Sequence, residues 1–171
     1  MALDTTIGGA SANSYASIAT ADAYHLAHGN AGWTGSDSLK EAALIRATDW
    51  LDGRYRARWP GKPVYLRDQA LCWPRAWATD VDGNPILSTV IPPEVVRAVC
   101  EAAVREIVTP FCLTPDVVIG REKVLTELKG IKWDMRATSA TTATLRPVLT
   151  AVDDLLSNII GATGSGIVRR G

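Results

Sequence analysis

The segment from residue 92 to residue 110 constrains the fold of this chain more than any other. Two prolines open it, as suits the first turn of a helix, and Pro110 ends it. Arg97, Glu101 and Arg105 mark a narrow polar strip at four-residue intervals. The remaining positions form a wide apolar stripe at three- and four-residue steps: Val95, Val96, Val99, Cys100, Ala103, Val104, Ile107 and Val108. A helix with so little polar surface needs neighbours on most sides, which predicts a central helix in a bundle.

Three further helices and one hairpin are predicted around this segment. A first helix starts at the N-cap Ser17, a second covers about residues 36–58, and a last one opens at Pro147. Two β-prone runs flank Lys129 and Gly130, which predicts a β-hairpin at about residues 117–136. The predicted fold class is mainly α: a small bundle of about four helices with one β-hairpin and flexible N- and C-terminal arms.

The length of 171 residues suits one domain. We expect an N-terminal arm over residues 1–16, a single helical domain over residues 17–160 and a flexible tail over residues 161–171. Inside the domain, residues 60–91 form a long irregular connector, and such connectors are often functional or contact elements. Its apolar residues are expected to anchor it in the core or in a neighbouring subunit: Val64, Tyr65, Leu71, Trp73 and Trp77.

Charge and cysteine content do not favour several classes of protein. The chain has 18 basic and 18 acidic residues, without the basic excess that is typical of non-specific nucleic-acid binding. Its three cysteines are odd in number and lack C-x-x-C spacing, which indicates neither a disulfide framework nor a zinc knuckle and suits a reducing cytosol. No apolar run approaches the roughly 20 residues of a membrane span, and no secretory signal is visible.

Three short patterns resemble ligand sites and are interpreted as ordinary structure. His25 and His28 lie one turn after Asp22 on the first helix, but a metal site needs further ligands. The run from Asp80 to Asn84 matches the start of a calcium loop and then departs from it. The glycine-rich residues 161–166 have no following lysine or helix to hold a phosphate. We therefore expect no cofactor, no metal, no catalytic residue and no enzymatic activity.

The stretch from Arg46 to Arg75 combines cations and aromatic residues and leaves two interpretations open. Such a stretch could follow a single nucleic-acid strand by stacking and phosphate contacts, in which case Arg54, Arg56, Arg58 and Trp59 would make them. The same composition fits a helix that buries tryptophans while its arginines bridge to a partner protein. Three aspartates dilute the positive charge, and we favour the protein-contact interpretation.

Five sequence runs resemble one family. They are residues 14–17, residues 21–24, the second-helix run Lys40 to Asp52, the run Gln69 to Arg75, and Asp82-Gly83 together with Ile91-Pro92-Pro93. Together they resemble the small proteins encoded among the head-completion genes of tailed bacteriophages, of the head–tail connector or adaptor type, over roughly residues 11–160. This is a pattern of structural residues and not a catalytic signature.

The resemblance implies a structural virion protein at the head–tail interface, made in the host cytoplasm. Its subunits would form a ring, a dodecamer by family resemblance, that docks to the portal protein, extends the DNA channel and receives a neck, stopper or tail-completion protein. Genomic DNA would pass through without sequence-specific binding, and no membrane would be involved. Some members carry a label comparing them with the primosomal DnaT single-strand-binding protein. The alternative function is therefore a DnaT-like single-stranded DNA-binding replication accessory protein.

Two contact sites are predicted for the ring. The tail residues Ile167, Val168, Arg169 and Arg170 are expected to order on the portal or a neighbouring subunit, since a β-prone apolar pair and two arginines follow a glycine-rich tether. Lys129 and Gly130, at the hairpin turn, are expected at the channel rim or against the neck protein.

Overall fold

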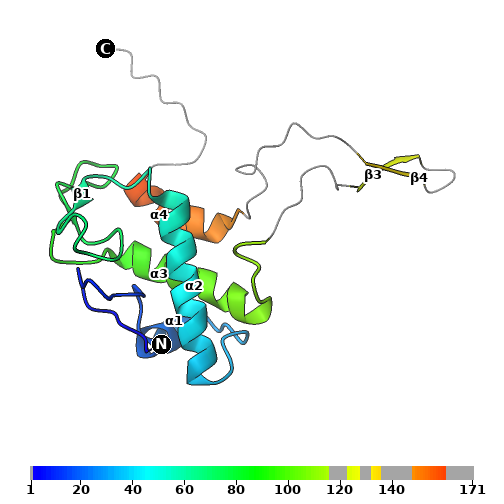
Figure 1. The fold of residues 1–171 in the computed structure, drawn as a ribbon, viewed down its shortest axis with the longest axis horizontal. Coiled ribbons are helices and arrows are strands. Elements are labelled where there is room, and N and C mark those ends of the chain that lie inside the picture. The colour runs from blue at the N-terminus through cyan, green and yellow to red at the C-terminus, as the bar shows by residue number, and fades with distance from the viewer. Residues whose placement is uncertain (1, 116–122, 128–131, 136–147, 161–171) are drawn as a thin grey trace, which may run out of the picture. The chain divides into compact units, whose positions relative to one another are not determined.

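The computed structural model of the chain describes residues 2–115, 123–127, 132–135 and 148–160 (Figure 1). The elements in these ranges are α1 (Ile18–Ala27), α2 (Asp37–Tyr55), β1 (Lys62–Pro63), β2 (Arg75–Ala76), α3 (Pro93–Val108), β3 (Lys123–Glu127), β4 (Lys132–Met135) and α4 (Thr150–Ile160). The mainly α fold class, with four helices and one β-hairpin within the described ranges, is confirmed. None of these helices is both long and apolar enough to span a membrane.

The chain divides into two compact units, residues 1–113 with 148–171 and residues 114–147. The second unit contains the predicted hairpin, in which β3 and β4 pair antiparallel with a register irregularity between Leu125 and Glu127. Its predicted turn residues, Lys129 and Gly130, lie outside the described residues, as do the tail residues from Ile167 to Arg170.

Helix α3 is the centre of the first unit, as the apolar stripe predicts. It packs against α2 and α4 (Figure 1). Val95, Val99 and Cys100 are fully buried. Because apolar residues occupy most of its circumference, the helix gains hydrophobic contacts on two sides at once.

Ser17 caps α1 as predicted, and Ser36 caps α2 at the predicted start of that helix. The Ser17 hydroxyl accepts a hydrogen bond from the Thr20 amide at 3.1 Å, and the Ser36 hydroxyl accepts one from the Leu39 amide at 3.4 Å. Each bond satisfies an amide that has no partner inside the helix. Helix α2 ends three residues before the predicted residue 58.

Residues 2–16, expected as an extended arm, fold back on the first unit. The Asn13 side chain accepts from the Asp4 amide at 2.8 Å and donates to the Ala2 carbonyl at 3.0 Å. Ser14, Tyr15 and Ala16 are buried. Small side chains let this segment approach the core closely, and the Tyr15 ring supplies the apolar surface that holds it there.

Candidate nucleic-acid interface

The β1–β2 loop, defined as residues 60–78, is closed at its base by a short antiparallel ladder and one buried arginine. Lys62 pairs with Ala76, and Pro63 pairs with Arg75. The guanidinium group of Arg75 donates to the carbonyl oxygens of Pro60 at 2.6 Å, Gly61 at 2.7 Å and Cys72 at 3.1 Å. The three carbonyl dipoles solvate a buried cation, and the cation in turn joins the two ends of the loop.

Gln69 fills the inside of the loop. Its side-chain oxygen accepts from the Tyr65 amide at 3.0 Å, and its amide nitrogen donates to the carbonyls of Leu71 at 2.7 Å and Pro74 at 3.2 Å. Backbone groups that would otherwise lack partners are thus satisfied by one side chain. The loop is irregular in conformation and fixed in position.

A half-buried carboxylate of α2, that of Asp52, and a tyrosine of the N-terminal segment attach the loop to the helices. The Tyr15 hydroxyl donates to the Asp52 carboxylate, with distances of 2.7 and 2.9 Å to its two oxygens, and accepts from the Trp73 amide at 3.0 Å. Asp52 also accepts from the Cys72 amide at 2.8 Å. Burial raises the pKa of the Asp52 carboxyl and of the Tyr15 hydroxyl.

The loop presents large side chains to solvent. Trp77 is 83% exposed and Tyr65 is 55% exposed, and Leu66 between them in sequence is also exposed. The backbone φ angles of Leu66 and Trp77, 54° and 55°, lie in the left-handed region. Bulky residues rarely adopt this region, and such strain is concentrated at functional sites.

Two cations accompany these side chains. Lys62 and Arg67 are exposed, and neither forms an ion pair with another residue of the described ranges. We call Lys62, Tyr65, Leu66, Arg67 and Trp77 the β1–β2 surface. A β-carbon on Gly61 would lie 2.2 Å from the Ala76 carbonyl oxygen, so only glycine lets the ladder close beneath this surface.

The structure places the tryptophans of the basic stretch in the core. Trp59 is 5% exposed, and its ring centre lies 5.8 Å from that of Tyr55 and 5.7 Å from that of Trp73. Trp50 and Trp73 are buried as well. Trp59 therefore lies among other rings of the core, and its contact with nucleic acid stays a prediction. Of the residues expected to anchor the connector in the core or in a neighbouring subunit, Trp73 is buried in the core, whereas Trp77 and Tyr65 are exposed.

The predicted arginine contacts lie at the C-terminal end of α2, just before the loop. The Arg54 guanidinium lies 5.7 Å from the Trp50 ring centre and 5.6 Å from that of Tyr55, and Arg58 lies 5.6 Å from the Tyr55 ring. Arg56 is exposed. These cations cover buried aromatic rings, and their contact with nucleic acid stays a prediction.

The patterns that resemble ligand sites have other structural roles. Asp22 accepts from the Trp33 indole at 2.6 Å and from Lys40 at 2.7 Å, and the buried His25 ring stacks on Trp33. Asp80 accepts from the amide of Asn84 at 2.8 Å, as in an ordinary turn. Within the described ranges, no group of three or more His, Cys, Asp or Glu side chains could hold a metal ion.

The family described as "Putative DnaT-like ssDNA binding protein" matches residues 1–171 of the chain. The chain belongs to this DnaT-like family. No curated protein and no solved structure matches it.

The family match corrects the resemblance to phage head–tail connectors. That identification is wrong, and so are the structural virion function and the partners it implied: the dodecameric ring, the portal protein, the neck, stopper or tail-completion protein, and genomic DNA passing through a channel without sequence-specific binding. The residues that suggested it include Ala43, Ala47, Leu51 and Trp73, which are buried core positions. Small helical bundles of different function share such positions, because core packing determines these residues and the binding partner does not.

Proposed function

We propose that the chain binds single-stranded DNA, as a DnaT-like replication accessory protein, and that the β1–β2 surface makes the central contact. The observation that carries the proposal is Trp77, an indole that is 83% exposed on a rigid loop, with Tyr65, Lys62 and Arg67 on the same loop. The description of the family, which matches the whole chain, supports the same function.

The chemistry of this surface suits an unpaired strand. A base can stack on an exposed aromatic ring whatever its identity, and cations beside the ring can contact the phosphates on either side of that base. Bases in a duplex are already stacked on their neighbours and do not offer a free face. We therefore expect a preference for single-stranded over double-stranded DNA and little sequence selectivity.

The fixed loop lowers the cost of binding. Arg75, Gln69 and Asp52 hold the backbone on either side of the exposed residues before any ligand arrives. A preorganised contact loses less conformational entropy on association than a loose one. The positive φ angle of Trp77 is part of this fixed loop conformation. It lets the indole leave the ladder while Arg75 and Ala76 remain paired.

Substitution of the exposed indole tests the proposal. We expect Trp77→Ala to weaken binding of a fluorescent oligo-dT about five- to a hundredfold, the effect of losing about 1–3 kcal/mol of stacking. Fluorescence anisotropy of the labelled strand measures the Kd. Leu87→Ala, which removes another exposed apolar side chain, is the matched control and should bind like the wild type. Equal Kd values for Trp77→Ala, Leu87→Ala and the wild type would contradict the assignment of this surface.

A further inference from the structure

We infer that the C-terminal end of α3 carries a second site for a nucleotide, where the Phe111 ring receives a base and the Arg46 guanidinium contacts its phosphate. The inference rests on the proposed function and extends it, because it gives the same DNA strand a second point of contact. Phe111 is 67% exposed although it is a large aromatic residue. Its φ angle of 62° lies in the left-handed region, which strains the backbone of such a residue.

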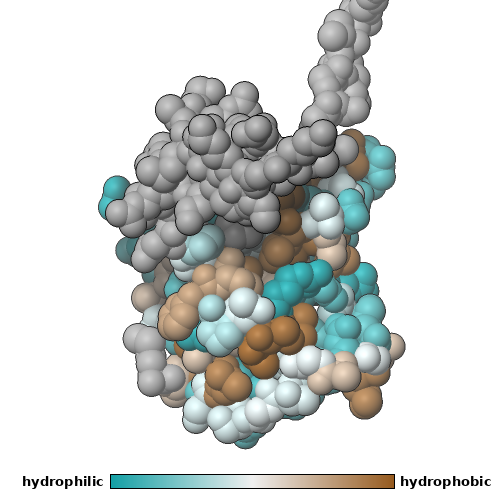
Figure 2. All heavy atoms as spheres, turned by 90° about the vertical axis from the view of Figure 1, so that its right-hand side faces the viewer, coloured by the Kyte–Doolittle hydropathy of each residue, from teal (hydrophilic) through white to brown (hydrophobic). Residues whose placement is uncertain are grey.

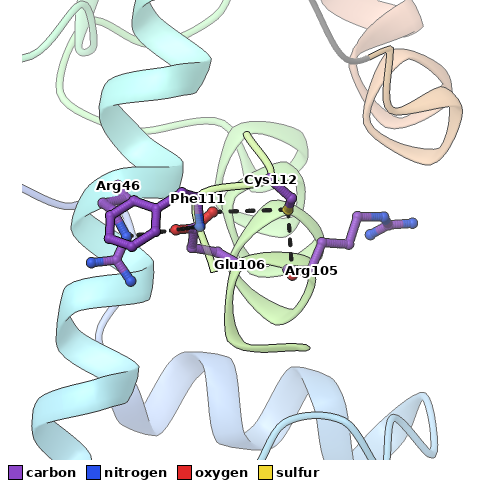
Figure 3. A network of polar contacts seen from close by, with 5 residues as sticks. All are labelled: Arg46, Arg105, Glu106, Phe111 and Cys112. Carbon is purple, nitrogen blue, oxygen red and sulfur yellow. Dashed lines mark hydrogen bonds and ion pairs between the residues drawn. The ribbon is translucent and has the colours of Figure 1, made fainter. Parts of the chain in front are cut away.

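A buried carboxylate holds both members of this site. Glu106 of α3 accepts from the Arg46 side chain at 2.7 Å and from the Phe111 amide at 2.7 Å (Figure 3). The Cys112 thiol donates to the Arg105 carbonyl at 3.4 Å and lies 3.8 Å from the Glu106 carboxylate. Glu106 is buried, so its charge needs these partners, and the partners are fixed by it. The same contacts make the strained conformation of Phe111 persist.

The Arg46 guanidinium lies 5.4 Å from the centre of the Phe111 ring, within the range of a cation–π contact. Only its Nε atom contacts Glu106, and the two terminal nitrogens point away from the carboxylate (Figure 3). Arginine side chains use these terminal nitrogens to contact phosphate oxygens. A nucleotide can thus place its base on the exposed part of the ring and its phosphate on the same arginine that lies against that ring.

The surroundings favour a nucleotide over an apolar segment of a partner protein. Figure 2 views the side of the molecule that includes the C-terminal end of α3, and there hydrophobic and hydrophilic residues alternate over the described atoms. An apolar partner requires a continuous apolar patch. Val108, near the same helix end, is also exposed. The exposed Phe111 ring with a cation beside it matches the combination that single-strand-binding surfaces use.

The two sites lie far apart on the first unit. In Figure 1, β1 and the C-terminal end of α3 are on opposite sides of the helices. A long strand can contact both sites on one molecule, whereas a short strand can occupy only one at a time. The dependence of affinity on strand length therefore separates the contribution of each site.

Phe111→Gly tests the inference with little risk to folding, because glycine adopts a φ angle of 62° without strain. We expect it to weaken binding of an oligo-dT of about 30 nucleotides about fivefold or more, as for the loss of one stacked base. Phe111→Tyr should bind like the wild type. Phe111→Leu, which keeps apolar bulk and removes the aromatic face, should bind like Phe111→Gly.

The outcomes separate this inference from the proposed function. If the wild type binds the long strand, Trp77→Ala weakens it and all three Phe111 variants equal the wild type, the second site is refuted and the proposed function stands. If Phe111→Leu binds like the wild type and Phe111→Gly does not, the contact is apolar and not a base stack, which also refutes the site. If the wild type binds no single-stranded DNA, both proposals fail.

Discussion

The Tyr15 hydroxyl links the β1–β2 loop to the rest of the first unit. It joins the N-terminal segment, the Asp52 carboxylate of α2 and the Trp73 amide of the loop. We expect Tyr15→Phe to lower the free energy of unfolding by about 1–3 kcal/mol, because it leaves the half-buried Asp52 carboxylate and the buried Trp73 amide each without one partner. Urea denaturation measures the change. Tyr65→Phe removes the hydroxyl of an exposed tyrosine and should change the stability by less than about 0.5 kcal/mol.

His25 gives the fold a dependence on pH. Burial lowers the pKa of this imidazole, and the nearby acids Glu101 and Asp22 only partly oppose the effect. Between the lowered folded-state pKa and the unfolded value of about 6.5, the unfolded chain binds more protons at this site than the folded chain. Stability due to this group is therefore present above about pH 6.5 and is lost as the pH falls through the window below it.

The test compares urea midpoints at about pH 7 and about pH 5. We expect His25→Gln to be less stable at neutral pH, because its ring no longer stacks on Trp33, and to lose less stability on acidification than the wild type. His28→Gln changes an exposed histidine of the same turn and should keep the pH dependence that His25 causes. An unchanged pH dependence in His25→Gln would show that other groups produce it.

At the scale of an element, the β1–β2 loop owes its conformation to Arg75. Arg75→Lys keeps the charge but cannot reach three carbonyl oxygens with the planar geometry of a guanidinium. We expect faster amide hydrogen exchange in residues 60–78, unchanged exchange in α3, and roughly fivefold weaker binding of oligo-dT, because Trp77 is then less well fixed. Arg67→Lys retains an exposed cation and should leave the exchange of the loop unchanged. Slower or equal exchange in Arg75→Lys would refute this role.

Helices could be predicted from the sequence to a greater extent than the loop. The 3.6-residue periodicity of residues 92–108 and the caps Ser17 and Ser36 depend on neighbouring residues in the chain, and these elements formed as expected. The loop depends on contacts between distant residues, such as Tyr15 with Trp73. Local patterns carry no information on such contacts, so the packing of residues 2–16 against the first unit could not be predicted.

Local sequence patterns also failed to predict which single residues of the candidate site are exposed. Trp73 and Trp77 are only four residues apart in sequence, yet Trp73 is 1% exposed and Trp77 is 83% exposed. Composition placed aromatic rings and cations between Arg46 and Arg75 without telling which rings are in the core. Trp59 was therefore named as a nucleic-acid contact only in the alternative interpretation, and Trp77, which lies beyond that stretch, was named only as an anchor of the connector. The positive φ angle of Trp77 distinguishes the two residues, but it is a property of the folded backbone and cannot be read from the sequence.

For the whole molecule, a net charge of zero limits the electrostatic part of DNA binding. If Lys62, Arg67 and Arg56 each contact one phosphate, the logarithm of the affinity should fall with the logarithm of the salt concentration with a slope of about −2. Replacing both Lys62 and Arg67 by glutamine should reduce the slope by about 1 or more. Titrations at several salt concentrations measure this. Lys40→Gln, which breaks an ion pair with Asp22, should leave the slope unchanged.

The N-terminal segment, residues 2–16, determines whether the β1–β2 loop can be studied apart from the rest of the protein. Residues 2–16 supply Tyr15, and a β-carbon on Gly8 would lie 2.4 Å from the Tyr65 ring. This segment therefore packs directly against the β1–β2 loop. The loop therefore does not keep its conformation outside this protein. We expect a synthetic peptide of residues 60–78, or a protein truncated to begin at α1, to have the sequence of the loop without its conformation.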